Sequence, residues 1–314
     1  MADKPFKTHE ELIALLISRG VDINSKEKKS FAKKKLQRIG YYNLINGYSD
    51  LFYDRTQGID IYKSGTTIDE IAYLYHFDEK LRQIFFKHIL PIETNIKSLV
   101  AYIFPQYHPE TNYLVYTNFN TVVRNANKLI PDLLAELQRQ ISGRTSDPSI
   151  SHYLEKYGYI PLWVLNNILT LGTLSKFYSL MKQKERQDIA KTFHLSDTEL
   201  ESCLLYISAI RNFCAHNNRL YCYRSKRVLC DTIHHQNMNL PISSSNEYLH
   251  GKRDLFAVMI VFKMLLSRND FKRLVKEVDK NLKNLYKHTV VLSQNDILNS
   301  MGFPADWKKL LLKK

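Results

Sequence analysis

The spacing of apolar residues predicts helices along most of this chain. After Thr8, Thr67 and Ser196, apolar residues recur every three or four positions, which is the period of a helix with one buried face. Each of these residues is followed three positions later by a glutamate, and this capping-box pattern satisfies free amide groups of the first helical turn. We therefore predict that a helix begins after each of them, and that Gly20 ends the first.

The same spacing predicts further helices and two irregular regions. The pattern after Thr67 is the longest, and Pro91 inside it predicts a kink or break before the helix resumes to about Phe104. Residues 105–127 carry the weakest pattern, and residues 217–251 form an expected insert whose length is typical of a functional loop. The other expected helices span residues 25–38, 129–141, 162–181, 184–193, 252–267 and 270–288, with a short one near the end of the chain.

These elements predict an all-α fold. Glycine and proline are scarce, at 10 and 9 of 314 residues, whereas the many turns of a β-sandwich or barrel depend on both. We expect a basic N-terminal helical extension over residues 1–62 and a larger helical domain over residues 63–290, which holds the insert. A short helical tail over residues 291–314 completes the expected organisation.

Charge narrows the class of partner. The net charge is +14, which attracts polyanions at long range, so nucleic acid is the first candidate partner and an anionic membrane surface the second. The longest apolar run, residues 255–266, contains Lys263 and is too short to span a membrane. The cysteines form no close pair and the first residues form no apolar signal segment, so we expect a cytoplasmic protein without a membrane partner.

The strongest candidates for chemistry are Arg211, Asn212 and His216, at the end of the helix after Ser196. Asn212 and His216 share one helix face, and Arg211 is about 100° from Asn212, so all three fit in one arc. Histidine moves protons near neutral pH, arginine holds phosphate, and asparagine can hold a phosphate oxygen or orient the imidazole. The set suits metal-free RNA cleavage by the 2′-hydroxyl, which leaves a 2′,3′-cyclic phosphate and a 5′-hydroxyl.

One histidine does not serve well as both acid and base in one step, so we predict a homodimer whose two copies face each other across a shared cleft. Spacing alone is weak evidence, because arginine followed by histidine after four to six residues occurs at Arg211–His216, Arg82–His88 and Arg227–His234. Only the first has asparagine after arginine and ends a capped amphipathic helix. The alternative for this set is that Arg211 and His216 cap the carbonyls of the helix end.

Residues 211–219, with the sequence Arg-Asn-Phe-Cys-Ala-His-Asn-Asn-Arg, resemble the Arg-x(4–6)-His signature of HEPN ribonucleases. More narrowly, the chain resembles the Abi-like (AbiD/AbiF) abortive-infection proteins of bacteria. Residues 15–23 with 36–48 are similar to the N-terminal pattern of that family, and residues 77–82 with 91–93 form a third similar block. The blocks cover most of residues 6–220 in the order of the family, which makes the resemblance more specific than the short motif alone.

This resemblance implies a HEPN-type helical bundle with an N-terminal helical extension. It implies an endoribonuclease without cofactor, the toxin of an anti-phage abortive-infection or toxin–antitoxin system, associated with a small noncoding RNA. By motif position, Arg211, Asn212 and His216 would carry catalysis, and Glu93 and Arg82 would pack or orient the site. The alternatives are a non-catalytic RNA-binding protein that forms a ribonucleoprotein with a small noncoding RNA, and a protein-interaction module with no RNA role.

Two basic segments are further candidate RNA contacts. The first lies in residues 26–38, where Glu27 is the only acid, and its alternative is a solvated helix face. It contributes Lys33, Lys34, Lys35 and Arg38. The second interleaves rings that can stack on bases with cations that can bind phosphate. It contributes Arg219, Tyr221, Tyr223, Arg224, Lys226 and Arg227.

Two other groups of residues are candidates for binding. Tyr41, Tyr42 and Tyr48 either stack on bases or pack in the core with their hydroxyls at the surface. The spacing of Cys222, Cys230, His234 and His235 fits no standard zinc site, so we expect no metal.

Overall fold

The computed structural model describes residues 5–56, 60–216 and 218–313, and these residues form the all-α fold that the sequence predicts. Isolated β-bridges occur in these ranges but no strand. A π-helix covers Tyr42–Asn46, and 3₁₀ turns cover Asp50–Phe52, Tyr116–Asn118 and Lys191–Phe193. The α-helices are α1 (His9–Ser18), α2 (Lys26–Ile39), α3 (Ile68–Tyr107), α4 (Ala126–Ser142), α5 (Pro148–Tyr157), α6 (Leu162–Ile168), α7 (Leu171–Leu180), α8 (Gln183–Ala190), α9 (Asp197–Ala215), α10 (Ile233–Asn237), α11 (Leu255–Leu265), α12 (Arg268–Tyr286), α13 (Gln294–Met301) and α14 (Trp307–Leu312).

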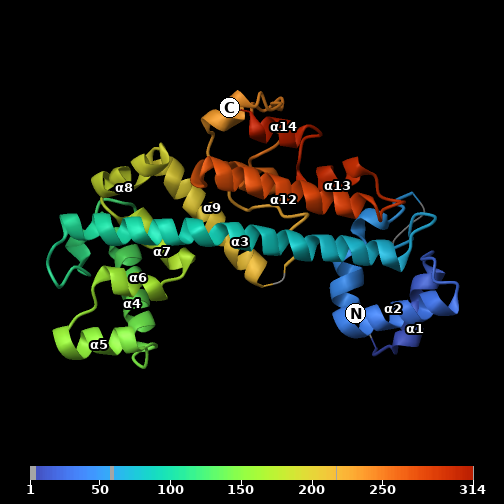
Figure 1. Cartoon of the computed structure of the whole chain (residues 1–314), viewed down its shortest axis with the longest axis horizontal. Coiled ribbons are helices and arrows are strands. Elements are labelled where there is room, and N and C mark those ends of the chain that lie inside the picture. The colour runs from blue at the N-terminus through green and yellow to red at the C-terminus, as the bar shows by residue number, and fades with distance from the viewer. Residues whose placement is uncertain (1–4, 57–59, 217, 314) are drawn as a thin grey trace.

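The long helix α3 organises the molecule. It runs through the middle of the chain's fold, with α1 and α2 near one end, α4 to α7 near the other, and α12 along its side (Figure 1). It packs on α6, α8, α9 and α12. In α11, which packs on α9, α12 and α14, every residue except Lys263 is buried. A helix that is apolar all round belongs in a core, and α11 is the centre of the C-terminal half of the fold.

Pro91 does not break α3, so the predicted kink or break at this residue is wrong. The helix continues for 40 residues with Pro91 and Pro105 inside it. Buried residues on both sides of Pro91, including Ile89 and Ile92, hold both parts of the helix in one core. Pro91 has no amide hydrogen, so the carbonyl four residues before it loses its helical hydrogen bond. Pro91 is exposed, so water can hydrogen-bond to that carbonyl instead. Tertiary packing on both sides therefore outweighs the single missing hydrogen bond.

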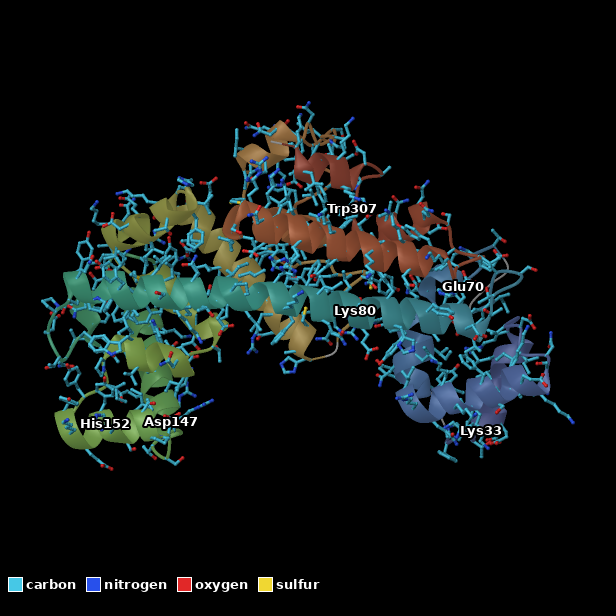
Figure 2. All side chains as sticks on the ribbon, in the orientation of Figure 1. Lys33, Glu70, Lys80, Asp147, His152 and Trp307 are labelled. Atoms are coloured by element: carbon cyan, nitrogen blue, oxygen red, sulfur yellow. The ribbon has the colours of Figure 1, made fainter. Side chains whose placement is uncertain are left out.

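Two of the predicted capping boxes are confirmed, and the third differs. Thr8 and Ser196 each form the reciprocal pair of hydrogen bonds with the glutamate three residues later. The hydroxyl of Thr67 accepts a hydrogen bond from the Glu70 amide, but the buried Glu70 carboxylate turns elsewhere. It accepts hydrogen bonds of 2.9–3.1 Å from the backbone amides of residues 290–292 (Figure 2 labels Glu70). Glu70 thus ties the chain between α12 and α13 to the start of α3.

Two other differences have local causes. The single helix expected over residues 162–181 is two helices, α6 and α7, because Leu169 is extended and Thr170 caps α7. Helix α5 was not predicted, although Asp147 caps it and Pro148 occupies its first turn, a common start signal. Among the helices of the described residues, none is long and apolar enough to cross a membrane.

Candidate active site at the end of helix α9

The candidate catalytic side chains lie in the last two turns of α9. The buried stripe of this helix ends at Ile210 and packs against α3, α7 and α11. Beyond Ile210 the helix leaves the core, so Arg211 is half-buried, whereas Asn212 and His216 are exposed. His216 is the last residue of the helix end, and its backbone amide donates to the Asn212 carbonyl at 3.0 Å. The three side chains therefore share the surface of one helix end.

Arg211 has an unusual environment for an arginine. Its guanidinium carbon lies 5.7 Å from the centre of the Phe86 ring on α3, a cation–π arrangement. Its Nε is buried and has no hydrogen-bond partner among the described residues. A buried donor without an acceptor costs about 1–3 kcal/mol. Because Nε is shielded from solvent, an anion would bind Arg211 through the terminal nitrogens of its guanidinium. Because Nε has no partner, it caps no carbonyl of the helix end in the part of the chain that is described.

A buried cluster around Asp78 holds the chain that follows α9. The Asp78 carboxylate, fully buried on α3, accepts hydrogen bonds from the Arg82 guanidinium at 2.6 Å and the Tyr48 hydroxyl at 2.7 Å. It also accepts from the backbone amides of Leu220 at 3.1 Å and Tyr221 at 2.6 Å. We call Tyr48, Asp78, Arg82 and these two amides the Asp78 cluster. Because it fixes the chain just after His216 to α3, it restricts where the end of α9 can lie.

Burial raises the pKa of Asp78, while the charge of Arg82 and the hydrogen bonds from Tyr48 and the two amides oppose that rise. Burial also raises the pKa of the Cys214 thiol, to about 12. Arg82 lowers and Asp78 raises that thiol pKa, although both effects are smaller than burial. Cys214, in the middle of the candidate motif, is therefore a neutral thiol within electrostatic reach of Asp78 and Arg82. It is not an activated nucleophile.

A small polar pocket of about 210 Å³ adjoins the Asp78 cluster, and its lining includes Tyr42, Tyr48, Asn218 and Arg219. Arg219 donates to the carbonyls of Asn46 and Gly47, at the end of the π-helix, at 3.4 and 3.0 Å. Of the three tyrosines considered for stacking, Tyr48 is in the core, Tyr41 is half-buried and Tyr42 is 76% exposed. The pocket can admit a small polar group such as a phosphate, and Tyr42 is the ring that a base could reach.

Tyr221 and Tyr223 are buried, so the prediction that they stack on RNA bases is corrected. Tyr221 is 2% exposed and stacks on Tyr48, with ring centres 5.6 Å apart. Tyr223 is 8% exposed and packs edge-on against Phe213. The alternation of rings and cations resembles an RNA-binding pattern, but the amides of this segment bind Asp78 and turn the rings into the core.

The cations of the same segment remain at the surface. Arg224 donates to the carbonyls of Tyr223, Asn299 and Ser300. Lys226 and Arg227 are exposed, and their side chains form no ion pair with any described residue. Arg219 and Arg224 are thus partly used to fasten the loop, which leaves Lys226 and Arg227 as its free positive charges.

The basic run on α2 is divided between intramolecular contacts and solvent. Lys33 forms an ion pair with Glu10 on α1 at 2.6 Å, and the Lys35 ammonium lies 3.1 Å from Nε2 of His76. Lys34 and Arg38 are exposed. Ala32 and Leu36, on the opposite side of α2, are buried. A phosphate-binding role and a solvated face both fit this arrangement, as they did from sequence.

The two expected supporting residues have different surroundings. Arg82 belongs to the Asp78 cluster and also donates to the carbonyl of Asn218, at 3.2 Å, so it contacts the chain next to the motif. Glu93 forms an ion pair with Lys97, one turn further along the same helix, at 3.0 Å, and within the described residues it forms no ion pair with α9. The Arg82–His88 pair falls within the same range of spacings as the candidate motif, but His88 is buried, and its Nε2 lies 3.3 Å from the Glu277 carboxylate.

Within the described residues, Cys222, Cys230, His234 and His235 belong to no cluster of metal ligands. Within residues 5–56, 60–216 and 218–313, no three His, Cys, Asp or Glu side chains are grouped to hold a metal ion. His235 is buried, with Nδ1 accepting from the Thr232 amide at 3.2 Å and Nε2 donating to the Gly251 carbonyl at 2.8 Å. Both ring nitrogens are therefore used to hold the loop between α9 and α11. Asn217, the first residue of the expected insert, lies outside the described residues.

Asp78 and Tyr48 were missed as contributors to this site. The available signal was Asp78 and Arg82 four residues apart within an otherwise apolar helix face, which indicates a buried ion pair. No local pattern shows that this ion pair binds the backbone amides of Leu220 and Tyr221. Leu220 lies 142 positions from Asp78 along the chain.

Comparison with known proteins gives one match. The model of a protein family described as Abi-like protein matches residues 34–222, which is more than half of the chain. These residues include the Asp78 cluster, all three candidate catalytic residues and most of the helices packed on α3. No curated protein and no solved structure matches.

Proposed function

Because the chain belongs to the Abi-like protein family, we propose that it is a metal-independent endoribonuclease, the toxin of a bacterial abortive-infection or toxin–antitoxin system. The observation that carries the proposal is the state of Arg211. Its guanidinium is held over Phe86 with a buried Nε that no described residue satisfies, on the same helix end as the exposed His216. This combination suits an anion that bridges the two side chains.

In the proposed reaction, His216 accepts the proton of an RNA 2′-hydroxyl as that oxygen attacks the adjacent phosphorus. The bond from phosphorus to the 5′-oxygen breaks, and this oxygen takes a proton from His216 of a second copy. Arg211 stabilises the negative charge that develops on the phosphate, and Asn212 holds one of its oxygens. The products are a 2′,3′-cyclic phosphate and a 5′-hydroxyl, and neither metal nor cofactor enters the balance.

The test is cleavage of single-stranded RNA by the purified full chain in EDTA. We expect fragments with 5′-hydroxyl and 2′,3′-cyclic phosphate ends, and a loss of about 10²–10⁴ in rate for His216→Ala, the usual contribution of a general base or acid. His152→Ala is the matched control, because His152 is exposed on α5, away from the end of α9 (Figure 2). If His216→Ala and His152→Ala cleave equally well, His216 has no catalytic role.

The homodimer is tested separately. Sedimentation equilibrium should give the mass of two chains, and activity per chain should rise with protein concentration through the same range in which the dimer forms. A fully active monomer would show that one copy supplies both proton-transfer groups, and the shared cleft would be discarded while the ribonuclease proposal stands.

A second candidate function is a non-catalytic RNA-binding protein that forms a ribonucleoprotein with a small noncoding RNA. The net charge of +14 and the exposed Lys34, Arg38, Lys226 and Arg227 favour it. It predicts RNA binding that weakens steeply with salt, and no fragments with 5′-hydroxyl ends. Sequencing the RNA that co-purifies with His216→Ala distinguishes the two, because a substrate would be recovered intact and diverse, and a structural RNA as one species.

A further inference from the structure

A large groove lies between α3 and α12, outside the site at the end of α9. Its volume is about 980 Å³, and lysines from both helices line it. The two helices run side by side in Figure 1, and Figure 2 labels Lys80 in the N-terminal half of α3. The lysines are Lys80 and Lys87 on α3, Lys280 and Lys283 on α12, and Lys287 directly after the end of α12. We propose that this groove binds a single strand of nucleic acid, with the lysines on the phosphates and Tyr73 against a base.

The acids of the groove are already neutralised within the protein. Glu277 pairs with Lys87 at 2.7 Å and lies 3.3 Å from Nε2 of His88. Asp279 pairs with Lys283 at 3.0 Å and with Lys308 at 2.7 Å. These pairs cancel the negative charges and use two of the five lining lysines.

Three lysines remain without a counter-charge. Lys80, Lys280 and Lys287 are exposed, and none of them forms an ion pair with another described residue. Lys80 is on α3, Lys280 is on α12 and Lys287 directly follows α12, so both walls of the groove contribute. Like charges facing each other across a groove repel, and a bound polyanion removes that repulsion. The arrangement therefore favours an anionic ligand that extends along the groove.

The aromatic end of the groove favours a polynucleotide over an acidic peptide. Tyr73, which lines the groove and is 38% exposed, stacks on His288 with ring centres 3.9 Å apart and planes 6° apart. Nucleobases stack on such rings whatever their sequence, whereas acidic side chains gain nothing from them. From Tyr73 to Lys87 the groove follows α3 for about 21 Å, the length of roughly six stacked nucleotides.

The groove also lies close to the candidate active site. Phe86, which packs under Arg211, is the residue before Lys87, so only the width of α3 separates the groove from the end of α9. One strand bound in the groove could continue over this part of α3 to Arg211. The identity of the ligand as RNA rests on the proposed function, whereas the existence of the site rests on the groove itself.

Fluorescence anisotropy with a labelled single-stranded RNA of about twelve nucleotides, roughly twice the length that the groove spans, tests this site. The parent protein is His216→Ala, so that binding is measured without cleavage. The variant Lys80→Ala/Lys280→Ala/Lys287→Ala in this parent should bind about a hundredfold more weakly near 0.1 M salt. The slope of log affinity against log salt should fall in magnitude by about 2, since each phosphate contact contributes about 0.7.

The matched control is Arg268→Ala/Lys272→Ala/Lys276→Ala, which removes three exposed cations from α12 outside the groove. It has the same net charge as the groove variant, and we expect at most a few-fold loss of affinity. Equal losses in the two triple variants would show that net charge alone attracts RNA. Unchanged affinity in the groove variant would show that RNA binds elsewhere.

Tyr73→Ala tests the stacking part of the inference. It should weaken RNA binding about fivefold or more while leaving the binding of heparin, a polyanion without bases, unchanged. If poly-glutamate competes with RNA as effectively as a polynucleotide of equal charge does, the assignment of the groove to nucleic acid is wrong. If the groove variant loses RNA binding but the wild-type protein shows no cleavage, the groove is a binding site and the ribonuclease proposal is wrong. If the wild-type protein cleaves RNA and the groove variant binds RNA as tightly as its parent, the ribonuclease proposal stands and the groove is not the binding site.

Discussion

Two faces of the same helix carry charges with opposite uses. On the buried face of α3, Asp78 and Arg82 are 0% and 4% exposed, and the carboxylate accepts four hydrogen bonds. On the exposed face, Lys80 and Lys87 line the groove with α12, and Lys80 has no ionic partner among the described residues. The charges on the buried face are paired and hydrogen-bonded within the protein, whereas those on the groove face remain accessible to solvent.

The comparison shows how burial assigns a charge to structure or to binding. A charge taken out of water must be paired and hydrogen-bonded, so Asp78 and Arg82 are fixed in one geometry and can position the chain after α9. A charge left in water costs nothing to keep unpaired, so Lys80 stays available to a ligand. Arg211 is intermediate, since it is partly buried and yet its Nε has no described partner.

The largest expected effect is at the buried face. Asp78→Asn leaves Arg82 buried without its opposite charge, so the free energy of unfolding should fall by about 3–5 kcal/mol in urea denaturation. The control is Glu79→Gln on the next position of α3, where an exposed carboxylate lies 3.2 Å from His76. That change should cost less than about 1 kcal/mol. Similar losses in the two variants would mean that the Asp78 cluster does not anchor the fold.

Next is the reactivity of Cys214, which reports on the same buried face. Because its pKa is raised to about 12, the thiolate is nearly absent at pH 8. Alkylation by iodoacetamide should be roughly thirtyfold slower than for the denatured chain, after the greater nucleophilicity of a high-pKa thiolate is included. The rate should rise with pH, because deprotonation limits it. Mass spectrometry of the peptide measures this, and rapid alkylation of the native protein at pH 8 would contradict the packing of Cys214.

A smaller effect is expected from one hydrogen bond of the Asp78 cluster. Tyr48→Phe removes the hydroxyl that donates to Asp78 at 2.7 Å and keeps the ring that stacks on Tyr221. The free energy of unfolding should fall by about 1 kcal/mol. Tyr42→Phe, on an exposed ring of the same segment, should leave thermal stability unchanged. If Tyr48→Phe is equally neutral, the hydroxyl does not contribute to the cluster.

The smallest effect on stability is expected at the groove. Lys80→Ala/Lys280→Ala removes two exposed cations that form no ion pair with a described residue, so the free energy of unfolding should change by less than about 0.5 kcal/mol. The same variant should still weaken RNA binding. A loss of stability comparable to that of Asp78→Asn would show that the two faces of α3 do not differ as described.

Local patterns predicted the elements that depend on local interactions. The starts of α1 and α9 follow from capping boxes, which involve residues three positions apart, and both are confirmed. The prediction failed at Pro91, where packing of the helix on both sides outweighs a local defect, and at Glu70, whose carboxylate leaves its own helix for the amides of residues 290–292. Tyr221 lies in a segment whose composition is typical of an RNA contact, but its side chain is buried in the core.

By itself, the sequence determined that this protein is helical and that Arg211, Asn212 and His216 share one arc at a helix end, because the helical period acts over a few residues. Only the tertiary structure decided that Asp78 would hold the chain after His216, that Tyr221 would be covered, and that lysines from α3 and α12 would face each other across a groove. Those outcomes depend on which surfaces exclude water together, and they join residues far apart in the chain.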